Sequence, residues 1–99
     1  MGHRVFKARD GQEGVDVFRA EHEHIDVVLV DMRMPRMSGA QCFTEILKID
    51  PDARVLMASG FSHEEDVNAM LEKGLKGFVH KPYHREELAS AIARAIGED

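Results

Sequence analysis

The stretch VVLVDMRMP, residues 27–35, decides the fold of this chain. Four apolar residues, three of them valine, run directly into Asp31, and Pro35 follows four positions later. A strand that is apolar at every position is typical of a sheet covered by helices on both faces. We therefore predict a buried strand over 26–30 that ends on a carboxylate.

Strands and helices alternate along the rest of the chain. Apolar runs predict strands, and apolar residues at helical spacing between them predict helices. The expected strands are 3–8, 26–30, 53–59 and 77–81, and the expected helices are 12–23, 39–49, 63–73 and 84–96. Strands joined by helical crossovers run parallel, so the fold class is an open parallel α/β sheet, which binds ligands at the carboxyl ends of its strands.

Composition points to one small domain spanning residues 1–99. The chain has 99 residues, a net charge of −5 and no basic stripe, which disfavours direct nucleic-acid binding. No apolar run approaches the roughly 20 residues needed to cross a bilayer, and the start lacks the apolar core of a signal peptide. A single cysteine, Cys42, suits a reducing, cytoplasmic setting.

Reactive side chains gather where the expected strands end. Asp10, Asp31, Ser59 and Lys81 follow the four strands in turn. Each has an ordinary structural explanation, since such an acid or serine often lies in a turn or caps a helix and a lysine is usually solvated. Together they suit phosphoryl transfer to a carboxylate, because Asp can act as the nucleophile and an ammonium can neutralise phosphoryl charge.

Three motifs resemble the receiver domains of two-component response regulators. They are VVLVDMRMPRMSG at 27–39, ASG at 58–60 and GFVHKPY at 77–83. The resemblance covers essentially the whole chain and implies a flavodoxin-like fold. It also implies that Asp31 is a phosphoacceptor that receives a phosphoryl group from a histidine kinase or phosphotransfer domain. Such a module is no enzyme beyond its own phosphorylation and dephosphorylation.

The resemblance also assigns the residues around the acceptor. Ser59 matches the switch hydroxyl, Lys81 the phosphoryl-binding amine and Phe78 the switch aromatic, and the Lys81–Pro82 peptide is expected to be cis. The combination of SGF at 59–61 and KPY at 81–83 looks most like receivers at the carboxyl ends of hybrid sensor kinases.

In the loop after the acceptor, Arg33 matches the position whose backbone carbonyl binds Mg²⁺. Pro35 and Gly39 match structural positions of the same loop. Asp31 and the Arg33 carbonyl are therefore the metal ligands that the resemblance assigns to this chain.

The start of the chain departs from the family. Receivers begin with another strand and helix, and that strand ends in two adjacent acids that bind Mg²⁺. The opening MGHRVF resembles the entry to the family's second strand, so the chain looks truncated at its amino terminus. Asp31 alone offers few hard ligands. We therefore predict poor Mg²⁺ binding and slow or absent phosphorylation.

The strand over 26–30 also lacks the neighbour that the family places beside it. Two arrangements remain open. The segment 3–8 could pair with it directly and bring Asp10 next to Asp31. Alternatively, two chains could pair or exchange elements to form a homodimer, because an open strand edge invites another chain.

A phosphatase or a metal-binding protein fits the residues less well than a receiver, whereas a protein-interaction module remains an alternative. A haloacid-dehalogenase-type phosphatase needs a second acid two residues after its nucleophile, where this chain has Arg33. The HEH at 22–24 is better explained as a solvated helix end than as a metal site. The remaining alternative is a protein-interaction module that docks a downstream partner without phosphorylation.

Overall fold

The computed structural model describes residues 4–31, 37–60 and 64–97, and these form alternating strands and helices. The elements in chain order are β1 (Val5–Ala8), α1 (Gly11–Glu21), the short 3₁₀ helix η1 (His22–His24), β2 (Val27–Asp31), α2 (Gly39–Ile49), β3 (Val55–Ser59), α3 (Glu64–Glu72), β4 (Gly77–His80) and α4 (Arg85–Ile96). The predicted order of strands and helices is confirmed. The first predicted helix ends earlier, at Glu21, because the chain tightens into η1.

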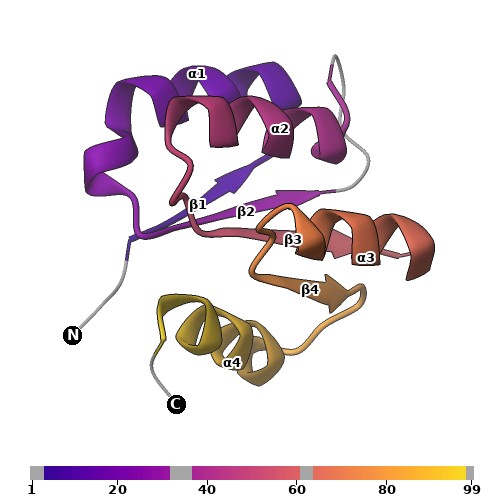
Figure 1. Cartoon of the computed structure of the whole chain (residues 1–99). Helices are drawn as coiled ribbons and strands as arrows, with labels where there is room; N and C mark the ends of the chain where they lie inside the picture. Colours follow the sequence, from indigo (N-terminus) through magenta and orange to yellow (C-terminus); the bar gives the residue numbers. More distant parts are fainter. Residues whose placement is uncertain (1–3, 32–36, 61–63, 98–99) are drawn as a thin grey trace.

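The four strands form one parallel sheet in the order β1-β2-β3-β4 (Figure 1). β1 pairs directly with β2, with Val5 opposite Val27 and Ala8 opposite Val30. This is the first of the two arrangements left open by the sequence. Within the described chain, β2 therefore has a hydrogen-bonded neighbour on each side, and the open α/β fold predicted from the sequence is confirmed.

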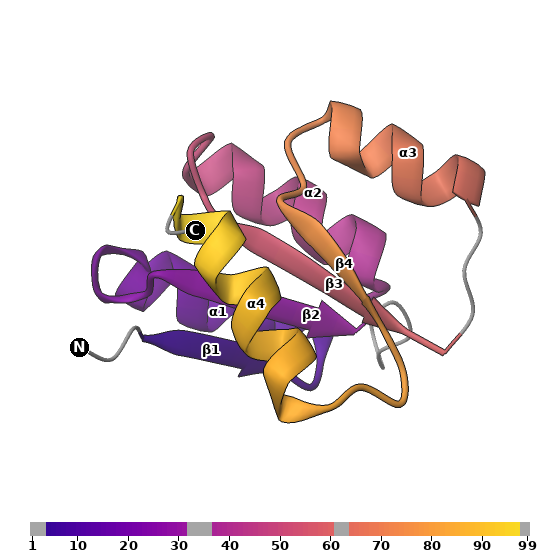
Figure 2. The same ribbon diagram turned by 90° about the horizontal axis from the view of Figure 1, so that it is seen from below.

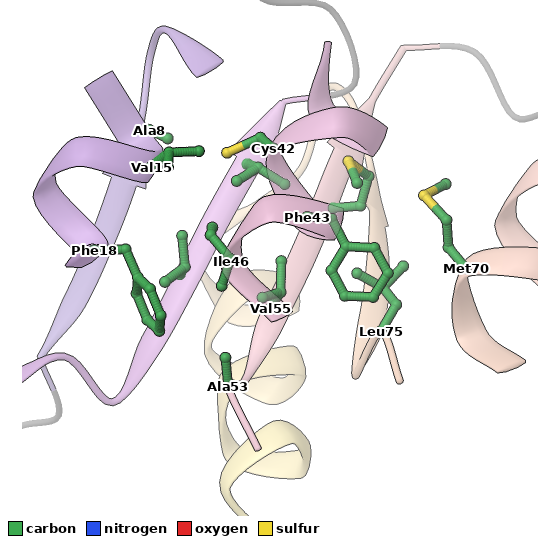
Figure 3. Close-up of a cluster of buried hydrophobic side chains, with 13 residues drawn as sticks. Ala8, Val15, Phe18, Cys42, Phe43, Ile46, Ala53, Val55, Met70 and Leu75 are labelled. Carbon is green, nitrogen blue, oxygen red and sulfur yellow. The ribbon is translucent and has the colours of Figure 1, made fainter. Parts of the chain in front are cut away.

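One face of the sheet is covered by α1, α2 and α3 (Figure 1). Phe18 of α1, Phe43 and Ile46 of α2, and Met70 of α3 pack there against Val28 and neighbouring strand residues (Figure 3). Since side chains alternate between the faces of a strand, Val28 and Val30 point to this side. This cluster is the larger of the two apolar cores.

The opposite face is covered by α4, which lies across the strands in the view from below (Figure 2). Ala91 and Ala95 of this helix pack against a second cluster that includes Val27, Leu29 and Leu56. Val27 and Leu29 alternate with the residues of the first cluster along β2. The two clusters explain why this strand is apolar at every position from Val27 to Val30.

Capping residues position two helices whose amino ends lie at the carboxyl edge of the sheet. The Asp10 carboxylate accepts hydrogen bonds from the backbone N–H groups of Gln12 and Glu13 at 2.9 and 3.3 Å, which caps α1. Ser38 caps α2 by accepting from the Gln41 N–H at 3.2 Å. Ser62, which precedes the third helix, lies outside the described residues. Among the helices of the described chain, none is long and apolar enough to cross a membrane.

Candidate functional site at the carboxyl edge of the sheet

The parallel sheet brings three strand ends together. Asp31 is the last residue of β2 and lies opposite Ala58 of β3. Ser59 ends β3 opposite His80, and Lys81 follows directly on β4. The carboxylate, the hydroxyl and the amine named by sequence therefore reach the same edge because their strands run parallel and in register.

Asp31 and Lys81 form an ion pair across this edge. The Lys81 Nζ donates a hydrogen bond to the Asp31 Oδ2, although the two residues are fifty positions apart in sequence. Their side chains are 31% and 41% exposed for Asp31 and Lys81, so water screens the attraction. Pairs of this kind add at most about 1 kcal/mol to stability. The pair therefore contributes little to the stability of the fold.

A cleft of about 180 Å³ opens beside this ion pair. Its described lining includes Asp31, Lys81, Lys7, Arg9 and Tyr83. The floor is apolar and comes from the ends of β1, β2 and β3. Two basic residues of the first strand thus join the lysine and the aspartate in one concave site.

Ser59 is buried, with 4% of its surface exposed. Its carbonyl accepts a hydrogen bond from the Lys81 N–H at 2.9 Å, which holds the ends of β3 and β4 together. Ser59 is not among the described residues that line the cleft. The structure thus places Ser59 beside the segment that carries Lys81.

Phe78 lies on β4 opposite Met57 of β3 and is half-buried against the core under α2. Its ring meets the His80 ring edge-on, with centroids 4.9 Å apart. His80 is exposed at the end of the strand. The aromatic residue therefore faces the side of the sheet opposite α4.

The residues expected to shape the loops are partly visible. The Lys81–Pro82 peptide is cis, as the resemblance implied. Gly39 is buried at the start of α2. Arg33 and Pro35, together with the rest of residues 32–36, lie outside the described residues.

Comparison with known proteins identifies the family. The family model for the response regulator receiver domain matches residues 1–93. The chain belongs to the response regulator receiver family. As a receiver it is similar to the chemotaxis protein CheY of Treponema pallidum, with 34% identity over 89 residues. That match covers 90% of this chain and 62% of the Treponema protein, so the chain spans less than two thirds of that relative.

Solved receiver structures share the fold. A response regulator receiver domain protein from Clostridium thermocellum has 32% identity and a TM-score of 0.82, over 90% of this chain and 71% of the other. The CheX–CheY–BeF3–Mg²⁺ complex from Borrelia burgdorferi contains a match with 36% identity and a TM-score of 0.81, over 85% of this chain and 63% of the other. These similarities support a flavodoxin-like receiver fold.

The described residues of this receiver do not fit the Mg²⁺ that the family binds. Mg²⁺ is held by oxygen ligands, usually including carboxylates. In the described lining of the cleft, Asp31 supplies the only carboxylate, and Lys7, Arg9 and Lys81 add positive charge. No group of three or more His, Cys, Asp or Glu residues suited to a metal occurs in the described part of the chain.

Asp10 has a structural role in this receiver. Its carboxylate caps α1, and it lies close enough to Cys42 for its charge to raise the pKa of that buried thiol. Cys42 belongs to the core cluster under α1 and α2, whereas the cleft lies on the α4 side of the sheet. Asp10 is not among the described residues of the cleft, so the idea that it replaces a missing acid gains no support.

Sequence reasoning missed Lys7 and Arg9. It placed Lys7 within the expected strand 3–8 and Arg9 between that strand and Asp10, and it gave neither residue a role at the site. Their alternation was the available signal, because side chains two positions apart point to the same face. That signal becomes useful only when β1 is known to pair directly with β2.

Proposed function

We propose that this receiver is a phosphoacceptor of a two-component phosphorelay and that Asp31 carries the phosphoryl group. The donor is the phosphohistidine of a histidine kinase or phosphotransfer domain. The observation that carries the proposal is the Asp31–Lys81 ion pair at the carboxyl edge of the sheet. An exposed carboxylate held beside an ammonium is suited to accept a phosphoryl group and to stabilise it afterwards.

The transfer is a displacement at phosphorus. One carboxylate oxygen of Asp31 attacks, an acyl phosphate bond forms, and the bond between phosphorus and the imidazole nitrogen breaks. The nitrogen keeps the electron pair. The Lys81 ammonium stabilises negative charge on the phosphoryl oxygens, and no step of the proposal depends on a metal, since the described cleft does not suit one.

Ser59 and Phe78 are proposed to transmit the change. Ser59 is one residue beyond Ala58, which lies opposite Asp31, so a small shift of the β3 end would bring its hydroxyl toward a phosphoryl oxygen. Phe78 packs beside β3 on the neighbouring strand and would then turn further inward. The surface formed by β4 and α4 would change with it and alter the docking of a downstream partner.

Incubation with a small phosphodonor tests the phosphoacceptor role. We expect intact-mass measurement to show one added phosphoryl group, formed slowly and at similar rates with Mg²⁺ or with a chelator. Hydroxylamine should remove the group, because it cleaves acyl phosphates. An Asp31→Asn variant that remains folded should gain no such group, and equal labelling of this variant would refute the assignment.

A protein-interaction module without phosphorylation is the second candidate. The observation that favours it is the absence of a second carboxylate from the described lining of the cleft. Under this alternative, prolonged incubation with phosphodonor leaves the chain unlabelled. Binding of a partner would then be the same for the chain and its Asp31→Asn variant under phosphorylating conditions.

The partners follow from the proposed role. The chain would meet a histidine kinase or phosphotransfer domain at the cleft and a downstream protein at β4 and α4. An origin in a hybrid sensor kinase is part of this proposal and rests on the sequence of residues 59–61 and 81–83 alone.

A further inference from the structure

The cleft beside Asp31 carries a surplus of positive charge. Its described lining contains three cations, Lys7, Arg9 and Lys81, and one carboxylate, Asp31. This leaves two formal positive charges, although the whole chain has a net charge of −5. The local charge is therefore opposite in sign to that of the chain as a whole.

The pairing of β1 with β2 explains why the basic residues reach the cleft. Lys7 lies opposite Leu29 in the register, and Arg9 follows two positions later, as Asp31 follows Leu29. Since alternate residues of a strand share a face, Lys7, Leu29 and Asp31 point to the α4 side of the sheet. Arg9 lies one residue beyond β1 and lines the same cleft, so both cations share the cleft with the acceptor carboxylate.

Such a site discriminates between ions by charge. A divalent cation meets three positive side chains and one carboxylate that already pairs with Lys81. A phosphate dianion is attracted by the same three positive side chains, since Arg can bind two of its oxygens at once and Lys can neutralise charge as a compact ammonium. The Asp31 carboxylate opposes an anion, but its ion pair with Lys81 offsets that repulsion.

We propose that this cleft is an oxyanion site for a phosphate group, in which Lys7 and Arg9 supply the positive charge and no divalent cation is required. The ligand class is inorganic phosphate or the phosphate of a small phosphodonor. The site binds the group noncovalently. The inference does not depend on phosphorylation of Asp31.

Titration with inorganic phosphate at constant ionic strength tests the site. Amide resonances of the full chain are followed by two-dimensional NMR, with Ala8 and Ala58 as reporters because both line the cleft. We expect saturable shifts in wild type and binding weakened about tenfold or more in a Lys7→Gln, Arg9→Gln double variant. A Lys7→Arg, Arg9→Lys variant keeps both charges and should retain most of the affinity.

The matched control removes the same two charges elsewhere. Arg54 and Lys76 are exposed and immediately precede β3 and β4, at the opposite end of the sheet. Arg54→Gln, Lys76→Gln should bind phosphate as wild type does. Shifts that do not saturate, or equal weakening in the two double variants, would mean general ionic attraction and would overturn the proposal.

Two further arms separate this site from a metal site and from the phosphoacceptor role. Mg²⁺ alone should cause no saturable shift at Ala8 and Ala58 and should not tighten phosphate binding. Saturable Mg²⁺ binding there would contradict the proposal. Asp31→Asn removes the opposing charge and cannot accept a phosphoryl group, yet it should bind inorganic phosphate at least as tightly as wild type. Weaker binding by this variant would also count against the proposal.

Discussion

Asp31 illustrates how far single residues could be predicted from sequence. A carboxylate that directly follows a run of buried apolar residues has to lie at the carboxyl edge of the sheet. Lys81 follows the last strand and reaches the same edge. Their ion pair therefore agrees with expectation. Ser59 could also be placed at this edge, but sequence alone could not say whether it lines the cleft, because side chains from several strands shape the cleft.

The fold alters the titration of the buried thiol of Cys42. Burial raises its pKa, and the nearby charge of Asp10 raises it further, from 9.0 to about 11. The Sγ also packs close to the place where a side chain on Gly14 would lie. The thiol should therefore stay protonated and unreactive at neutral pH.

The pKa shift of Cys42 makes a pH prediction. Below about pH 9 the thiol is protonated in both states, whereas between about pH 9 and pH 11 the unfolded chain releases a proton that the folded chain keeps. The free energy of unfolding should therefore fall as pH rises through this range. Urea unfolding with reducing agent at several pH values measures it, and the fall should be smaller in Cys42→Ala. Parallel curves for the two chains would contradict the prediction.

At the scale of elements, the boundaries of helices were predictable where capping residues mark them. Ser38 marks the start of α2, and Gly97, with a φ of 90°, terminates α4 in the left-handed conformation that glycine favours. The end of α1 was harder to predict, because helical spacing continues into His22 while the backbone changes to a 3₁₀ turn. Propensity alone does not distinguish these two kinds of turn.

Gly11 is where two elements approach most closely. It is buried at the start of α1, and a Cβ at this position would overlap the backbone carbonyl of Met37, just before α2. Backbone atoms cannot move aside as a flexible side chain can. The absence of a side chain therefore lets α1 lie against the segment that leads into α2.

A Gly11→Ala substitution should destabilise the fold by about 1–3 kcal/mol, because overpacking forces the backbone to shift. Gly60 offers a matched control, since a Cβ there would have no neighbour within 4 Å. Gly60→Ala should change the free energy of unfolding by no more than about 0.5 kcal/mol. Urea denaturation compares the two variants with wild type, and equal losses would disprove the importance of the contact at Met37.

At the scale of the whole molecule, the neighbours of each strand were the least predictable feature. Apolar residues at every position of β2 indicate that both faces are covered, but they do not say which strand pairs with each edge. The family resemblance left an empty place beside β2, and the structure fills it with β1. Because β1 occupies this place, Lys7 and Arg9 reach the cleft, so the basic character of the site follows from strand order.

Strand order also predicts the oligomeric state. The reason to expect a homodimer was an open edge on β2, and within the described chain β1 now covers that edge. The remaining edge on this side belongs to β1, a strand of four residues that carries the exposed Lys7. Short strands and lysines on an edge oppose pairing with another chain. We therefore expect sedimentation at increasing concentrations to give a constant monomer mass.

The edge of β1 should associate more readily when its charge is removed. Lys7→Val keeps a good strand former at the position and leaves an apolar residue beside Val5, which is 39% exposed. This variant should show a concentration-dependent increase in mass, whereas Lys7→Arg should remain monomeric because it keeps the charge. A stable dimer of the wild-type chain would instead mean that pairing of β1 with β2 does not prevent association with a second chain. It would support the exchange of elements between two chains.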